Sequence, residues 1–167
     1  RKYYWQADPC KALKYGTPPA GQVDIVPVEA PLNVLKTYGC LVYLGWNTMT
    51  PEQYAKIREY VRAGGSVFMA VPHLSTRTRN AGDLALINAG DVSDLFGVKV
   101  TGKGPVNEDI QFVKPARNRK YAFPAGALYL EECPLAEVKV TSGRILAQSR
   151  KGETVLVENR CGRGYAY

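Results

Sequence analysis

Residues 41–70 read LVYLGWNTMTPEQYAKIREYVRAGGSVFMA and carry the clearest structural signal in the chain. Leu41–Leu44 is a short apolar run of the kind found in parallel strands that are buried on both faces. Thr50 and Pro51 are typical of the N-cap and the first position of a helix. Gln53, three residues after Thr50, completes a capping box. We therefore expect a strand followed by a helix that begins at Pro51.

The expected helix covers residues 51–63 and is amphipathic. One face carries apolar side chains at helical spacing, namely Tyr54, Ile57, Tyr60 and Val61. Two glycines at 64–65 end the helix, and residues 66–70 (SVFMA) form a second short apolar run. Two apolar strands joined by a helix predict a parallel pair within an α/β domain.

Weaker patterns extend this unit on both sides. Further strands are expected at 23–28, 98–100, 136–140, 144–148 and 154–159, a short helix at 31–38, and helical turns at 83–88 and 92–97. The period-two stretches all lie after Gly104. We therefore predict an α/β fold: a three-layer sandwich with a mostly parallel central sheet and added antiparallel strands in the C-terminal third.

The length of 167 residues favours one domain, residues 1–167. The chain begins with Arg1 and ends within an expected strand, so we expect a piece of a larger multidomain protein. It has no run of about 18 apolar residues and no signal-peptide pattern, so no membrane contact is expected. The net charge is +7, but the basic residues are scattered except at 114–120. That cluster has no interleaved aromatic residues, which favours a solvated loop over a nucleic-acid site.

Cofactor and metal sites are poorly supplied. The four cysteines (10, 40, 133 and 161) show no CxxC spacing, and His73 is the only histidine, so no metal site is expected. No glycine-rich loop opens an apolar helix after a strand, so no phosphate-bearing cofactor is expected either.

Ligands of open α/β sheets bind outside the carboxyl ends of the strands. The candidate ligand-binding residues are those that follow the two strands, namely Trp46, Asn47, His73, Ser75 and Arg77. His73 could act as acid or base only if a carboxylate oriented it, and Arg77 could hold an anion. Trp46 could stack on a sugar ring or cover the core, and both interpretations stay open.

We expect no catalytic residue in this chain. Covalent catalysis would place Cys or Ser directly after the strand that ends at Ala70, but the turn there reads Val71-Pro72-His73. Neighbouring residues on a strand point to opposite faces, so the adjacent pair at 131–132 (Glu-Glu) does not suit glycoside hydrolysis.

Three segments together resemble a known fold family. They are residues 38–70 (YGCLVYLGWNTMTPEQYAKIREYVRAGGSVFMA), 94–100 (DLFGVKV) and 145–167 (ILAQSRKGETVLVENRCGRGYAY). They resemble the class I glutamine amidotransferase-like fold. In particular, they are similar to its non-catalytic version, the trimerisation-type domain of bacterial β-galactosidases and related carbohydrate-active enzymes. Active amidotransferases of this fold carry a Cys after the strand that matches 66–70 and a His-Glu pair near the end. This chain has neither.

The resemblance implies a catalytically silent accessory or assembly domain of a larger bacterial glycoside hydrolase. Its partners would be other domains of the same polypeptide and neighbouring subunits, with carbohydrate as a further candidate ligand, in an extracytoplasmic compartment. Two alternatives stay open: an enzyme that processes a sugar or amide in the crevice of Trp46 and His73, and a carbohydrate-binding module that uses the same crevice.

Overall fold

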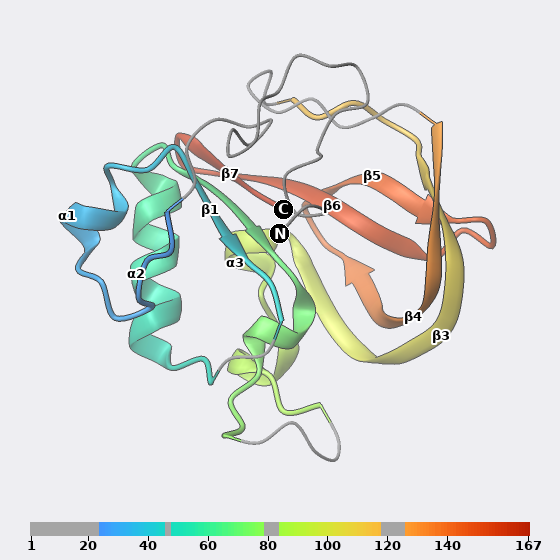
Figure 1. Ribbon diagram of the computed structural model, residues 1–167, viewed down its shortest axis with the longest axis horizontal. Coiled ribbons are helices and arrows are strands. Elements are labelled where there is room, and N and C mark those ends of the chain that lie inside the picture. Colours follow the sequence, from blue (N-terminus) through green and yellow to red (C-terminus); the bar gives the residue numbers. More distant parts are fainter. Residues whose placement is uncertain (1–23, 46–47, 79–83, 118–125) are drawn as a thin grey trace, which may run out of the picture. The chain divides into compact units, whose positions relative to one another are not determined.

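The computed structural model describes residues 24–45, 48–78, 84–117 and 126–167 (Figure 1). The helices are α1 (Leu32–Leu35), α2 (Pro51–Arg62) and α3 (Ser93–Phe96), with 3₁₀ helices η1 (Val71–Leu74) and η2 (Ile87–Gly90). The strands are β1 (Cys40–Tyr43), β2 (Ser66–Met69), β3 (Val98–Phe112), β4 (Gly126–Val140), β5 (Arg144–Ser149), β6 (Thr154–Cys161) and β7 (Gly164–Ala166). None of the helices in these residues is long and apolar enough to cross a membrane.

The seven strands form one mixed sheet in the order β1-β2-β7-β6-β5-β3-β4. Only the β1–β2 and β2–β7 pairs are parallel, and the other pairs are antiparallel. The expected antiparallel strands of the C-terminal third are confirmed, but the prediction of a mostly parallel sheet was wrong. The connections at 150–153 and 162–163, which join the paired strands β5–β6 and β6–β7, are too short for the crossovers that parallel neighbours need.

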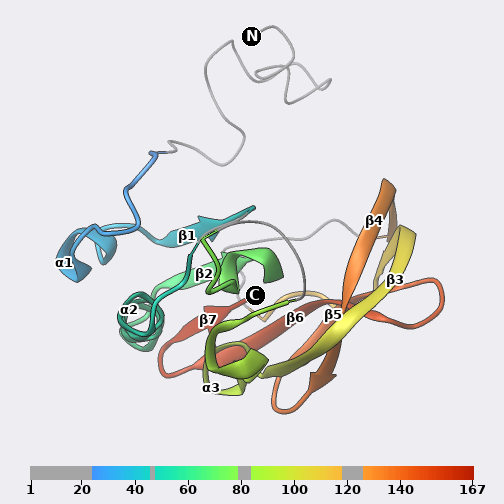
Figure 2. The same ribbon diagram turned by 90° about the horizontal axis from the view of Figure 1, so that it is seen from below.

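The helical layers also differ from the prediction. Among the described residues, α2 is the only helix longer than four residues, and it packs on β2 and β7 (Figure 2). A second helical layer, which a three-layer sandwich needs, is not found in this part of the chain. Residues 24–28 of the expected first strand form no strand, since Pro27 lacks a backbone donor and Ile25 is fully exposed.

The unit at 41–70 forms as its sequence predicts. The Thr50 Oγ1 accepts a hydrogen bond from the Gln53 N–H (3.2 Å), and the Gln53 Oε1 accepts one from the Thr50 N–H (3.1 Å), so the capping box is confirmed. The four apolar side chains of the predicted helix face are all buried, namely Tyr54, Ile57, Tyr60 and Val61. The strands on either side pair in register, with Leu41 beside Val67.

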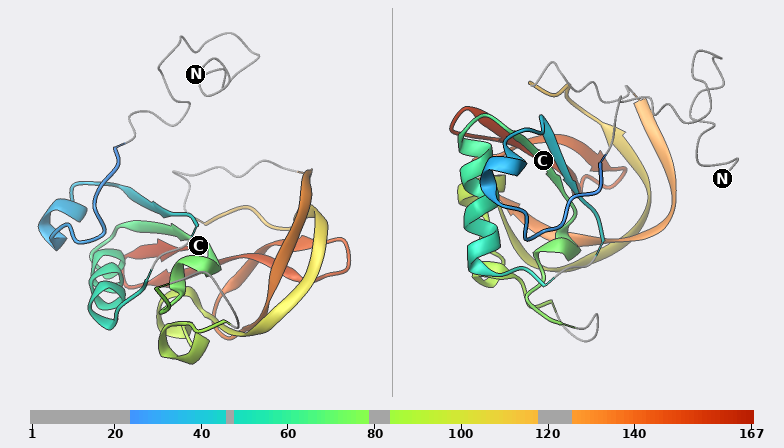
Figure 3. Two further views of the ribbon diagram at one scale, coloured as in Figure 1. Left: turned by 60° about the horizontal axis from the view of Figure 1, so that its bottom comes forward. Right: turned by 60° about the vertical axis from the view of Figure 1, so that its left-hand side comes forward.

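The strands β3 and β4 form a long curved ribbon at the other end of the sheet (Figure 3). Register shifts interrupt their pairing at Val100/Gly102, Lys103/Val106 and Asn107/Asp109. Each extra residue bends the strand that carries it and increases its twist. The last three residues of β3, 110–112, pair with β5, so the ribbon joins the rest of the sheet at that point.

Tyr60 fixes the distance between α2 and the start of β2. A Cβ on Gly65 would lie 2.1 Å from the Cζ of Tyr60, and a Cβ on Gly164 would lie 2.1 Å from the Gly65 carbonyl oxygen. The Tyr60 hydroxyl donates to the Tyr38 carbonyl oxygen at 2.9 Å. The absence of side chains at the two glycines therefore lets α2, β2 and β7 approach closely.

We expect Gly65→Ala to lower the free energy of unfolding by about 1–3 kcal/mol, because the added methyl group overpacks the Tyr60 ring. Urea denaturation of the two proteins measures this difference. Gly102→Ala is the matched control, since the nearest atom to its new Cβ would be a flexible carboxylate oxygen of Glu137 at 3.4 Å. Equal stability of Gly65→Ala and the parent would contradict the packing argument.

Candidate functional site

The connections that follow β1 and β2 lie side by side, as their place in the sheet predicts. The Thr48 hydroxyl donates to the Arg77 carbonyl oxygen at 3.0 Å, and the Met49 N–H donates to the Ser75 carbonyl oxygen. Trp46 and Asn47 lie outside the described residues. The other candidate residues of this crevice are His73, Ser75 and Arg77.

His73 lies in η1 against the end of β1. Its ring centroid is 4.9 Å from that of Tyr43, with the planes tilted by 60°. Both ring nitrogens are buried, and neither has a hydrogen-bond partner among the described residues. Burial lowers the pKa of His73, while the Leu44 backbone acts in the opposite direction. Burial therefore favours the neutral imidazole, and its ring nitrogens do not face solvent.

Ser75 also points inward. It is 1% exposed, and its Oγ accepts a hydrogen bond from the Arg77 N–H at 3.1 Å, which closes the turn after η1. Arg77 is exposed beside it. Among the described residues of this crevice, no nucleophile lies next to a base, and the use of the crevice as a ligand site stays a prediction.

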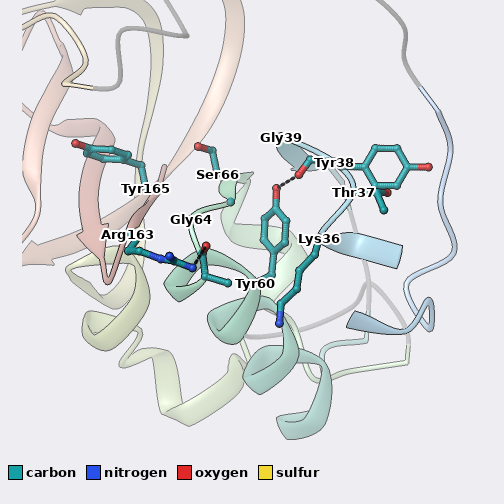
Figure 4. Close-up of a pocket in the computed structure, with 11 residues that line it drawn as sticks. Lys36, Thr37, Tyr38, Gly39, Tyr60, Gly64, Ser66, Arg163 and Tyr165 are labelled. Carbon is teal, nitrogen blue, oxygen red and sulfur yellow. Dashed lines mark hydrogen bonds between the residues drawn. The ribbon is translucent and has the colours of Figure 1, made fainter. Parts of the chain in front are cut away.

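A cavity of about 630 Å³ lies at the opposite, amino end of the parallel strands (Figure 4). Its cationic groups are already engaged. Arg163 donates through Nη2 to the Ala63 carbonyl oxygen (2.8 Å) at the end of α2, and the Lys36 ammonium lies 3.6 Å from the Glu59 carboxylate. The arrangement favours stabilisation of the helix end, where carbonyl groups lack partners, over ligand chemistry.

Another cavity, of about 900 Å³, lies along β5 and β6 beside the segment 114–117. At its wall the buried Glu158 carboxylate accepts hydrogen bonds from four donors. They are Arg144 Nε (3.2 Å), Arg144 Nη2 (2.8 Å), the Arg117 N–H (2.7 Å) and the Tyr167 hydroxyl (3.1 Å). Arg144 also donates to the Pro115 carbonyl oxygen. Burial, followed by the negative charge of Glu158 and its hydrogen bond, raises the pKa of Tyr167.

No sequence pattern predicted this cavity. Ligands of parallel strands are expected at the carboxyl ends of those strands, whereas the cavity lies where β6 exchanges one neighbour for another. Glu158 pairs with Arg144 of β5, and Asn159 pairs with Ala166 of β7. The available signal was the alternation of acidic and basic residues in Glu158-Asn159-Arg160, which has no distinctive spacing.

No protein-family model and no curated protein sequence matches this chain. Solved structures with a similar fold do exist. A β-galactosidase from Bacillus circulans sp. alkalophilus matches 89% of the chain and 22% of its own length, with a TM-score of 0.65 and 16% identity. A GH42 β-galactosidase from G. stearothermophilus matches 79% of the chain and 19% of its own length, with a TM-score of 0.55 and 15% identity.

A cytoplasmic protein from Salmonella typhimurium LT2 matches 87% of the chain and 68% of its own length, with a TM-score of 0.60 and 15% identity. At such identities the likeness shows the fold alone. The chain spans about a fifth of the length of the two β-galactosidase chains. Their match agrees with the β-galactosidase part of the resemblance, while the amidotransferase-like part stays a prediction.

We expect the stability of the protein to fall as the pH drops below about 6.5, in part through His73. Its folded pKa lies below the unfolded value, so the unfolded chain binds the proton first and gains free energy from it. His73→Phe keeps an aromatic ring against Tyr43 and cannot titrate. Urea denaturation between pH 7.5 and 5 should therefore show a smaller loss of stability in the variant. An identical pH dependence in both proteins would show that burial does not lower the pKa of His73.

We expect Glu158→Ala to lower the free energy of unfolding by about 3–5 kcal/mol, because it leaves the partly buried Arg144 guanidinium without a counter-charge. The double variant Arg144→Met/Glu158→Leu removes both charges and should lose less stability than Glu158→Ala alone. Thermal and urea unfolding of the three proteins measure both effects. A loss in the double variant equal to or larger than that in Glu158→Ala would contradict the coupling of the pair.

Proposed function

We propose that this chain is a catalytically silent accessory domain of a larger carbohydrate-active enzyme of the glycoside hydrolase type. The observation that carries the proposal is the extent of the structural likeness. It covers 89% of this chain but 22% of a β-galactosidase chain, so in that protein the fold is one part of a much larger chain. The proposed relation is to the amidotransferase-like, trimerisation-type domain of such enzymes.

The crevice at the carboxyl ends of β1 and β2 supports a silent role. The turn after β2 places Val71, Pro72 and His73 in a 3₁₀ helix, and the ring nitrogens of His73 are buried. The hydroxyl of Ser75 is used within its own turn. A hydrolytic mechanism would need at least one of these groups at the surface, next to an orienting partner.

The edge strand β1 offers a surface for a neighbouring domain or subunit. Val42 of β1 is 59% exposed, and Leu44, directly after the strand, is 65% exposed. Within the described residues, β1 pairs on one side only, with β2. Such an apolar edge is typically covered in a functional assembly. The catalytic carboxylates would then lie in the remainder of the enzyme.

A second candidate is a stand-alone protein that binds a ligand. The match with the Salmonella cytoplasmic protein favours it, because the fold there makes up 68% of the chain. In this case the crevice of Trp46 and His73 would be the site, and a titration with glycans would show affinity that falls in Trp46→Ala.

The two candidates predict different native masses. An antibody raised against this chain should capture, from source cells, a protein several times heavier than 18.4 kDa by intact mass spectrometry. The captured protein should hydrolyse at least one aryl glycoside of a standard panel. The chain of 167 residues alone, used as the control, should hydrolyse none. A native mass near 18.4 kDa would exclude the accessory role.

A further inference from the structure

The cavity along β5 and β6 has a positive charge that its own carboxylates do not cancel. Two acidic side chains line it, and each already has a basic partner: Glu158 with Arg144 at 2.8 Å, and Asp94 with Arg58 at 2.6 Å. Three more cations line it, namely Lys114, Arg117 and Arg160. None of these three has a carboxylate partner within 4.0 Å among the described residues.

The Glu158 network places two of these cations at the cavity. The Arg117 N–H donates to the Glu158 carboxylate, and the Pro115 carbonyl oxygen accepts from Arg144. On the other side of Pro115, the Lys114 N–H donates to the Leu146 carbonyl oxygen at 3.3 Å. The backbone of the segment 114–117 is thus tied to β5 and β6, while the side chains of Lys114 and Arg117 stay exposed. A positioned cation loses less entropy on binding an anion than a free one.

We propose that this cavity binds an acidic oligosaccharide, with its carboxylate groups contacting Lys114, Arg117 and Arg160. The volume of about 900 Å³ lies within the range of known ligand sites. Besides the cations, three polar side chains line it, namely those of Ser93, Ser142 and Asn159. Each already donates a hydrogen bond within the protein, and their remaining acceptor lone pairs can accept from sugar hydroxyl groups.

Single-stranded nucleic acid fits this cavity less well. Its sites combine basic grooves with several aromatic side chains on which successive bases stack. Tyr165 is the only aromatic side chain among the described residues that line the cavity. The proposal does not depend on the accessory role, because a stand-alone protein could bind the same ligand.

Calorimetric titration of the full chain with trigalacturonate tests the proposal. The double variant Lys114→Gln/Arg117→Gln should weaken binding about two- to thirtyfold, because two contacts between solvent-exposed charges are lost. Lys139→Gln/Lys151→Gln is the matched control, since it removes the same net charge from exposed lysines that do not line the cavity. It should keep the parental affinity. A neutral galactose trisaccharide should bind more weakly than trigalacturonate.

Several results would overturn the proposal. These are no binding of trigalacturonate at millimolar concentration, an equal loss of affinity in the control variant, or tighter binding of a single-stranded oligonucleotide of similar charge. Thermal unfolding of each variant serves as a check on folding, and Arg160→Gln provides a second, independent variant of the same cavity. The native mass plays no part in these outcomes, so failure here leaves the accessory role unaffected.

Discussion

Burial of the Glu158 carboxylate is the constraint on which the sheet depends. The side chain is 2% exposed, and a charge in such a place is tolerated only with a close partner and saturated hydrogen bonding. The donors come from three separate parts of the chain: Arg144 on β5, Arg117 after β3, and Tyr167 after β7. Because Glu158 is also where β6 changes neighbours, the network joins the parallel and antiparallel parts of the sheet.

The helix α2 is held against the sheet mainly by apolar packing. Asp94 of α3 accepts from the Tyr54 hydroxyl and pairs with Arg58, each at 2.6 Å, and so links α3 to α2. Both partners of the ion pair are more than a third exposed, so the pair contributes about 1 kcal/mol or less. Each large apolar side chain that α2 buries, such as Ile57, contributes about 1.5–3 kcal/mol to the stability of the fold. Burial therefore contributes more than the ion pair to holding α2 in place.

The sequence predicted the structure where local chemistry is sufficient. The capping box at Thr50 and the glycines after α2 define the helix and its two strands without help from distant residues. The sequence did not predict the full β3–β4 ribbon. Only residues 98–100 and 136–140 of it were expected to form strands. Gly102, Gly104 and Pro105 are typical of loops, yet β3 continues through them because β4 supplies the pairing and the bulges absorb the irregularity.

Of the helical turn expected at 83–88, residue 83 lies outside the described residues and 84–86 form no helix. A 3₁₀ turn lies at Ile87–Gly90 instead, with left-handed Asn88 and Ala89. The candidate residues of the crevice were expected from the general rule for parallel strands, and the structure does bring the loops of Thr48 and Arg77 together. The direction in which each side chain points was beyond sequence reasoning, because it depends on tertiary burial.

The position of the polar chemistry follows from the topology of the sheet. A parallel α/β sheet concentrates polar loops at one edge, since every strand ends there. Among the described residues only three neighbouring strands pair in parallel, β1, β2 and β7. The hydroxyl of Tyr167, which follows β7, is used to saturate Glu158. The three cations without a carboxylate partner in the described part of the cavity, Lys114, Arg117 and Arg160, lie beside β6, where parallel and antiparallel pairing meet. A fold shared with part of a β-galactosidase does not by itself imply a shared site, so the search for a ligand starts from the charges of this chain.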